Sequence, residues 1–163
     1  MISEKSLAAF AKEVAKYPPE QKQSAVMACL QIVQQESGFV SPEHERLVAD
    51  YLGMAPMAVH EVTSFYNMYN QKPVGKYKLN VCTNLPCQLR QGAQAMAHLK
   101  AKLGIDANQT TPDGLFTLQE CECLGACADS PVMLVNDTAM CSFMTDDKLD
   151  QLVDGLRAME VKS

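Results

Sequence analysis

The sequence predicts a chain of mixed α+β and α/β class, in which an N-terminal helical bundle precedes a domain built around a βαβ unit. Two observations lead to this prediction. Apolar residues recur at helical spacing as far as residue 69, and from residue 77 they alternate with polar residues as in a strand. The polar stretch 70–75 separates the two patterns, so we expect a helical domain over residues 1–72 and a second domain over residues 73–163.

Four helices are expected in the first domain. The first ends before the Pro18–Pro19 pair, because proline lacks an amide hydrogen and restricts the residue before it. A second helix follows over residues 20–37. Ser41 begins the third helix as an N-cap, with proline at the next position, and this helix runs to residue 52. The fourth covers residues 56–69. The short turns between these helices predict an antiparallel cluster.

A different set of elements is expected in the second domain. Alternating apolar residues predict strands, glycine and proline mark the turns, and helical spacing returns in two stretches. The predicted order is a strand, a helix, three strands and a helix. These elements are a strand over 77–81, a helix over 88–103, strands over 115–119, 132–135 and 140–143, and a helix that begins after Thr145.

The composition excludes several functional classes. The chain has 14 Lys and Arg residues against 19 Asp and Glu residues, a net charge of -5, and an acidic chain repels nucleic acid. No apolar run approaches the roughly 18 residues that a spanning helix requires. The N-terminus has neither the basic start nor the apolar core of an export signal. We therefore expect a cytoplasmic protein with no nucleic-acid partner and no segment inserted in a membrane.

Four of the seven cysteines follow predicted strands. Cys82 and Cys87 form a C-x4-C pair after the first strand, and Cys123 and Cys127 form a C-x3-C pair after the second, with 35 residues between the pairs. A crossover helix makes these two strands parallel, which places their carboxyl ends at one edge of the sheet. Open α/β sheets bind their ligands at this edge. We therefore expect the two pairs to converge there.

Convergent thiols in a chain without an export signal can form disulfides, bind structural zinc or hold an iron–sulfur cluster. A reducing compartment disfavours disulfides, and four-cysteine zinc sites usually have shorter spacings in compact knuckles. The longer C-x4-C spacing is like that of plant-type ferredoxins and favours iron–sulfur. Cys121 could replace Cys123 as a ligand, because alternate strand residues share a face. Cys29 and Cys141 are expected to be packing residues.

An iron–sulfur cluster also needs positive dipoles or hydrogen-bond donors around it. Two ferric ions, two sulfides and four thiolates carry a net charge of about −2, which one-electron reduction makes about −3. Cys87 is expected at a helix N-terminus, where free amides point toward an anion. Gly125 permits a turn that offers backbone amides between the second pair. Lys78 and Arg90 are the nearest cations in the sequence.

A combination of motifs spans most of the chain. The motifs are Ser64-Phe65-Tyr66, residues 73–77 (PVGKY), the C-x4-C pair, residues 113–118 (DGLFTL) and residues 122–127 (ECLGAC). Together they resemble the small 2Fe-2S subunit of bacterial respiratory complex I, the NADH:quinone oxidoreductase. The resemblance implies a thioredoxin-like 2Fe-2S ferredoxin domain with one 2Fe-2S cluster. The implied ligands are Cys82, Cys87, Cys123 and Cys127, which leaves Cys121 as a neighbour outside the cluster.

In that family, the small subunit docks on the one that binds NADH and flavin mononucleotide (FMN), and its cluster accepts electrons from the flavin. The resemblance therefore implies a component of an enzyme with no catalytic site of its own. Its partners would be the FMN- and NADH-binding subunit and other peripheral-arm subunits, on the cytoplasmic side of the inner membrane. The sequence has no G-x-G-x-x-G motif after a strand, which agrees with this division of labour.

Other functions share some of these features. The equivalent diaphorase subunit of an NAD-linked hydrogenase or formate dehydrogenase has the same motifs. A free shuttle ferredoxin would leave the helical half without a role. A zinc-stabilised interaction module with no redox activity is the alternative from a different class.

Overall fold

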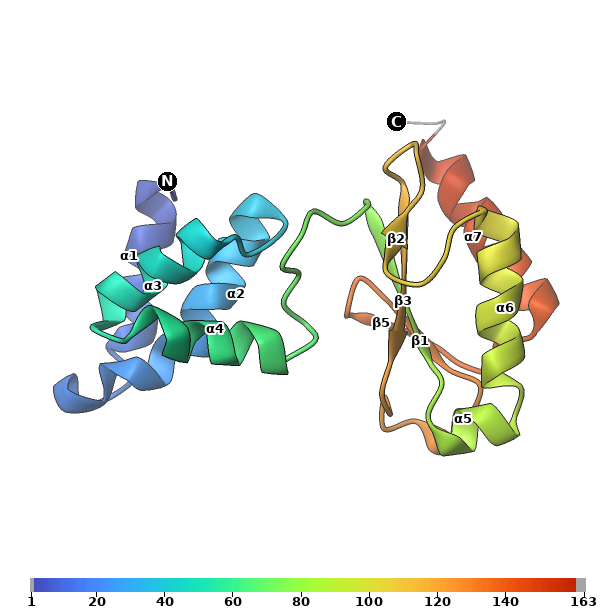
Figure 1. The fold of residues 1–163 in the computed structure, drawn as a ribbon, viewed down its shortest axis with the longest axis horizontal. Coiled ribbons are helices and arrows are strands. Elements are labelled where there is room, and N and C mark those ends of the chain that lie inside the picture. The colour runs from blue at the N-terminus through green and yellow to red at the C-terminus, as the bar shows by residue number, and fades with distance from the viewer. Residues whose placement is uncertain (1, 161–163) are drawn as a thin grey trace. The chain divides into compact units, whose positions relative to one another are not determined.

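The computed structural model describes residues 2–160, which form two compact units. The first unit ends at Pro73 and the second begins at Val74; Figure 1 shows helices alone in the first and helices with strands in the second. Over the described residues, no helix combines the length and the apolar character that crossing a bilayer requires. The fold class predicted from the sequence, a helical part followed by a mixed helix-and-sheet domain, is confirmed.

Over its described residues, 2–73, the first unit contains four α-helices and one 3-10 helix. They are α1 (Glu4–Val14), the 3-10 helix η1 (Pro19–Ala25), α2 (Val26–Ser37), α3 (Pro42–Leu52) and α4 (Pro56–Phe65). As predicted, Ser41 is the N-cap of α3. Its hydroxyl accepts the amide hydrogen of His44, and the ring of His44 accepts that of Ser41. α2 and α3 end at Gly38 and Gly53, which both have left-handed conformations.

Two boundaries in this unit differ from the prediction. The helix predicted over residues 20–37 begins as the 3-10 helix η1, and its α-helical part starts at Val26. The helix predicted over residues 56–69 ends at Phe65, and the next residue has an extended conformation. Tyr69 is buried outside α4, where its hydroxyl donates to the carbonyl oxygen of Met27. This contact with α2 satisfies the hydroxyl of the buried Tyr69. Because Tyr69 is buried although it lies beyond α4, the apolar pattern of the sequence extends past the end of the helix.

The helices of the first unit enclose a core of their own. Its fully buried side chains include Phe10, Leu30, Val33, Val40, Val48, Leu52 and Val59. A buried polar contact joins α3 to α4, because the carboxylate of Glu45 accepts a hydrogen bond from Thr63 and contacts the ring of His60 at 3.1 Å. Cys29 is also fully buried in this core, as expected for a packing residue.

A five-stranded mixed sheet forms the centre of the second unit, in the order β2-β3-β1-β4-β5. β1 and β3 pair in parallel, and β4 and β5 extend the sheet in antiparallel fashion. The register places Cys82, at the end of β1, beside Cys121 at the end of β3. The strands are β1 (Tyr77–Cys82), β2 (Gln109–Thr110), β3 (Phe116–Cys121), β4 (Met133–Val135) and β5 (Ala139–Cys141).

Helices α6 (Gly92–Leu103) and α7 (Asp146–Glu160) lie side by side on one face of this sheet (Figure 1). The core between the helices and the sheet includes Leu79, Val81, Met96, Leu99, Phe116, Leu118, Leu149 and Val153. Asp150 of α7 joins the two helices, because it contacts His98 at 2.8 Å and Lys102 at 3.1 Å. The apolar core holds the crossover helix α6 against β1 and β3, and the Asp150 contacts join α6 to α7.

The crossover contains two helices where the sequence predicts one over residues 88–103. α5 (Leu85–Leu89) and α6 are separate because Gln91 has a left-handed conformation, with φ of 71°. After this break, Gly92 lies against the backbone of the cysteine segment. A Cβ at Gly92 would be 2.9 Å from the carbonyl carbon of Cys87 and 3.0 Å from the carbonyl oxygen of Cys82. β2 is also absent from the prediction, since its two residues are too few to show alternation.

Replacing Gly92 tests this close approach. Gly92→Ala is expected to lower the free energy of unfolding of the second unit by about 1–3 kcal/mol, because the new methyl group meets backbone atoms. The matched control is Gly155→Ala in α7, where no atom outside the neighbouring residues and backbone of the helix itself lies within 4 Å of the added Cβ; it should raise that free energy by about 0.5–1 kcal/mol. Urea unfolding, monitored by amide exchange in β1, measures the change in the free energy of unfolding in both variants. Equal effects of the two substitutions would contradict the close approach.

Candidate metal centre

All four predicted ligands lie at the carboxyl edge of the parallel pair β1 and β3. Cys82 is the last residue of β1, and Cys87 is the third residue of the short helix α5. Cys123 and Cys127 lie in the loop that follows β3, and Cys127 begins the one-turn 3-10 helix η2 (Cys127–Asp129). The predicted crossover is thus confirmed in its essential feature, since the parallel register brings both strand ends to one edge.

The first cysteine pair is buried. Cys82 and Cys87 are each 1% exposed, and they pack with Val132 in a small apolar cluster. Leu124 and Ala126 also pack against this cluster. Because these two residues lie between Cys123 and Cys127, their contacts hold the loop of the second pair against the first pair.

The second pair is exposed to solvent. Cys123 and Cys127 have their sulfur atoms 3.5 Å apart. Gly125 lies between them with φ of 77°, a conformation that favours glycine, and its amide donates a hydrogen bond to the Cys123 sulfur at 3.4 Å. The expectation that this glycine turns the loop and offers a backbone amide is confirmed.

The pKa values of these thiols follow their surroundings. Burial raises the pKa of Cys82, and its contact with Cys87 adds to this effect, although the amides of Asn84 and Leu124 oppose it. Burial also acts to raise the pKa of Cys87, but hydrogen bonds with Ser130 and the backbone of Val132 outweigh it and lower the pKa below its ordinary value. The two thiols of the first pair therefore differ, with the pKa of Cys87 lowered and that of Cys82 raised, and the thiolate is the form that binds metal.

The remaining cysteines have thiols that resist ionisation. Burial, together with the nearby Cys82 and Cys87, raises the pKa of Cys121 to about 12. In the helical unit, burial raises the pKa of Cys29 to about 11. Cys141 of β5 is half-buried, and burial raises its pKa as well. Cys121 packs beside the first pair, so its thiol is close to the predicted ligands Cys82 and Cys87.

The geometry of the thiols can be compared with what a metal requires. Among residues 2–160, no group of three or more His, Cys, Asp or Glu side chains is placed to hold a single metal ion. The four cysteines form two pairs instead. Two thiolates that bind one tetrahedral ion at about 2.3 Å lie about 3.8 Å apart, close to the 3.5 Å between Cys123 and Cys127. A binuclear cluster needs two such pairs, so the donor set fits a 2Fe-2S cluster.

The cations nearest in sequence have different surroundings. The ammonium of Lys78 is buried and pairs with Asp137. Arg90 follows α5 and lines a hollow of about 440 Å³ with Leu89, Ser130 and Phe143. Ser130 is a site residue that the sequence does not indicate. Its hydroxyl lies 3.4 Å from the Cys87 sulfur, and only the folded chain reveals this contact.

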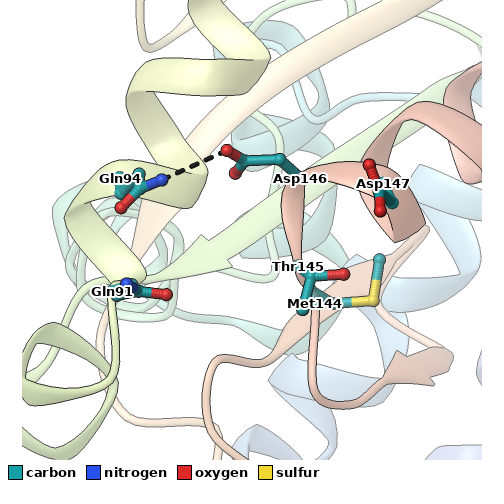
Figure 2. A pocket seen from close by; sticks show the side chains of 6 residues that line it. All are labelled: Gln91, Gln94, Met144, Thr145, Asp146 and Asp147. Carbon is teal, nitrogen blue, oxygen red and sulfur yellow. Dashed lines mark hydrogen bonds between the residues drawn. The ribbon is translucent and has the colours of Figure 1, made fainter.

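A second hollow, of about 250 Å³, lies at the beginnings of α6 and α7 (Figure 2). It is lined by Gln91, Gln94, Met144, Thr145, Asp146 and Asp147. Figure 2 shows Gln94 turned toward Asp146, to which its amide donates a hydrogen bond at 3.1 Å. None of the cysteines lines this hollow, so we do not assign it to the metal centre.

The fold and the site together define a class of protein. A sheet with helices packed on one face carries two thiol pairs at its carboxyl edge, as in a thioredoxin-like iron–sulfur protein of the ferredoxin type. The chain belongs to the thioredoxin-like [2Fe-2S] ferredoxin family, whose profile matches residues 10–157. The family predicted from the sequence motifs is therefore confirmed. Membership in this family also favours an iron–sulfur cofactor over zinc.

Proteins similar to this chain include named subunits of NADH-quinone oxidoreductase. The chain is 44% identical over 144 residues to NADH-quinone oxidoreductase subunit 2 of Thermus thermophilus, with 88% of this chain and 80% of that protein covered. It is 42% identical over 145 residues to an NADH-quinone oxidoreductase subunit of Rickettsia bellii, covering 88% and 86%. Against the mitochondrial NADH dehydrogenase [ubiquinone] flavoprotein 2 of Dictyostelium discoideum, it is 40% identical over 155 residues, covering 93% and 63%.

A solved structure has the same fold. The structure of an NAD+-reducing [NiFe]-hydrogenase in the air-oxidized state contains a chain that matches with a TM-score of 0.71 and 18% sequence identity. The match covers 83% of this chain and 23% of the hydrogenase chain. At this identity the likeness concerns the fold, and the present chain corresponds to less than a quarter of the longer one.

Thiol alkylation of the iron-free chain tests the contrasts in exposure and pKa. At about pH 8, iodoacetamide is expected to modify Cys123 first. Cys29 and Cys121 should stay almost unmodified, because Cys29 is buried, Cys121 is partly buried and both thiols are protonated. The alkylation rates of Cys29 and Cys121 should rise roughly tenfold per pH unit, since the reactive thiolate becomes more abundant as the pH approaches the pKa of the thiol. Peptide mass spectrometry measures each site, with the denatured chain as control. Reaction of Cys121 as fast as Cys123 would refute the assigned environments.

Proposed function

We propose that this chain is the electron-transfer subunit of NADH:quinone oxidoreductase and holds one 2Fe-2S cluster on Cys82, Cys87, Cys123 and Cys127. One observation carries the proposal. In a member of a [2Fe-2S] family, the parallel register of β1 and β3 brings two cysteine pairs to one edge of the sheet. Similar proteins that are named as subunits of this enzyme support the wider function.

The protein residues define what the site can do. When bound, a 2Fe-2S cluster takes up and passes on single electrons without a proton or substrate site. The buried Cys82 and Cys87, with Val132, would hold one side of it away from water. The exposed Cys123 and Cys127 would leave the other side accessible. The chain thus acts as a relay within an enzyme and needs no catalytic residue of its own.

The expected electron donor is the FMN of a neighbouring NADH-binding subunit, with other peripheral-arm subunits in contact and the cytoplasmic side of the inner membrane as the location. Exposed apolar side chains beside the site support docking. Leu85 and Leu89 flank Cys87 on α5 and are 64% and 78% exposed, and Phe143 lines the same hollow as Leu89. Apolar surface of this kind beside a redox site suits an interface with another protein.

Serine variants test the ligand assignment. Replacing Cys123 with serine is expected to abolish or rebuild the cluster, because a hydroxyl is a poor substitute for a thiolate ligand, and the same holds for Cys82, Cys87 and Cys127. Cys121→Ser is the matched control, two residues away on the same segment, and should leave the cluster largely intact. Iron, sulfide and zinc analysis of anaerobically purified chain, beside a visible spectrum, measures the outcome.

Two results would overturn the assignment. A wild-type chain that contains zinc and no sulfide would exclude electron transfer and favour a structural module. Loss of the cluster in Cys121→Ser, with retention in Cys123→Ser, would show that Cys121 is the ligand.

Co-purification tests the enzyme to which the chain belongs. The tagged chain, expressed in its native cell and isolated after mild solubilisation, is expected to bring with it an NADH- and FMN-binding subunit and membrane subunits of a quinone reductase. Mass spectrometry identifies them, and an untagged strain is the control. Recovery of soluble hydrogenase or formate dehydrogenase subunits in place of membrane subunits would assign the chain to those enzymes.

A further inference from the structure

Ser130 joins the two halves of the metal centre. It follows η2 and precedes β4, and it is 2% exposed. Its hydroxyl oxygen lies 2.7 Å from the carbonyl oxygen of Cys127 and 3.4 Å from the sulfur of Cys87. One buried hydroxyl therefore contacts a residue of the exposed pair and a residue of the buried pair.

The hydrogen atoms at this site can be counted. In the thiol form, the Cys87 S–H donates to Ser130, and the Ser130 hydroxyl donates to the carbonyl of Cys127. A Cys87 thiolate has no proton to donate, so its sulfur becomes an acceptor only. The Ser130 hydroxyl then has two acceptors for its single hydrogen. Cys87 is 1% exposed, which leaves little access for water to supply another donor.

We infer that Ser130 is a positioning residue that raises the reduction potential of the centre by donating a hydrogen bond to the Cys87 thiolate. The inference rests on the proposed function, because it requires a cluster on these cysteines. Hydrogen bonds to charged acceptors are stronger than neutral ones. A donor beside a cluster ligand therefore stabilises the reduced form, which carries the greater negative charge, more than the oxidised form.

Nearby hydroxyl groups differ from Ser130 in their partners. Thr83 follows Cys82 directly, but its hydroxyl donates to Glu120. Ser142 lies opposite η2, and its hydroxyl donates to the carboxylate of Asp129 at 3.3 Å. Both hydroxyls are bound to carboxylates, so neither is directed at a ligand sulfur. This difference provides a control for any general effect of removing a hydroxyl near the site.

The test is a redox titration of the full chain with its cluster, monitored by electron paramagnetic resonance. Ser130→Ala is expected to lower the equilibrium constant for reduction of the cluster roughly tenfold. This change lowers the midpoint potential by about 59 mV for a one-electron couple. Ser142→Ala, the matched control, should leave the potential unchanged. Ser130→Thr keeps the hydroxyl and should also keep the wild-type potential. A fall in Ser130→Thr equal to that in Ser130→Ala would overturn the inference, because altered packing around the buried position would then explain both.

Deuterium exchange provides a second readout that a purely structural role would not change. In D2O, pulsed electron paramagnetic resonance should detect several exchangeable deuterons near the reduced cluster, including those of backbone amides such as Gly125. The coupling of the Ser130 hydroxyl deuteron should be present in the wild type and in Ser142→Ala and absent from Ser130→Ala, while the amide couplings remain. An unchanged signal or an unchanged potential in Ser130→Ala contradicts the inference. Iron and sulfide analysis of each sample separates this failure from that of the proposed function, since a wild-type chain without sulfide would lack the cluster altogether.

Discussion

The parallel pairing of β1 with β3 is the constraint on which the metal centre depends. The cysteine pairs are 35 residues apart in the chain, and nothing in either segment alone would bring them together. The six-residue register from Tyr77 and Phe116 to Cys82 and Cys121 places both strand ends at one edge. A one-residue slip would turn every side chain of a strand to the opposite face. The apolar core that fixes this register therefore also fixes the relative positions of the two strand ends that carry the site.

The crossover must also satisfy a steric condition. A single continuous helix after β1 would carry the chain away from the cysteines, whereas the turn at Gln91 brings the start of α6 back against them. Gly92 permits this approach because it has no side chain. α6 then packs on the sheet beside α7, and Asp150 links the two helices through His98 and Lys102. Packing of the helices and placement of the proposed ligands are thus parts of one arrangement.

Features that depend on local pattern could be predicted from the sequence, and features that depend on distant contacts could not. The N-cap at Ser41 and the turn at Gly125 follow from the properties of the residues themselves. The break at Gln91 has no comparable signal, because glutamine seldom adopts positive φ. The buried position of Tyr69 beyond the end of α4 depends on a distant contact, its hydrogen bond to Met27 of α2. The approach of Ser130 to Cys87 requires two segments 43 residues apart in the chain to be folded together.

Electrostatics explains why hydrogen bonds matter at this edge. The chain is acidic, with a net charge of -5, and a 2Fe-2S cluster with four thiolates adds about −2 when oxidised. The nearest buried cation in sequence, Lys78, pairs with Asp137. At the mouth of the site, Glu122 accepts a hydrogen bond from Asn84. Oriented dipoles therefore contribute to neutralisation, among them the amide of Gly125 at the exposed pair and, by our inference, the hydroxyl of Ser130, which lies 3.4 Å from the Cys87 sulfur at the buried pair.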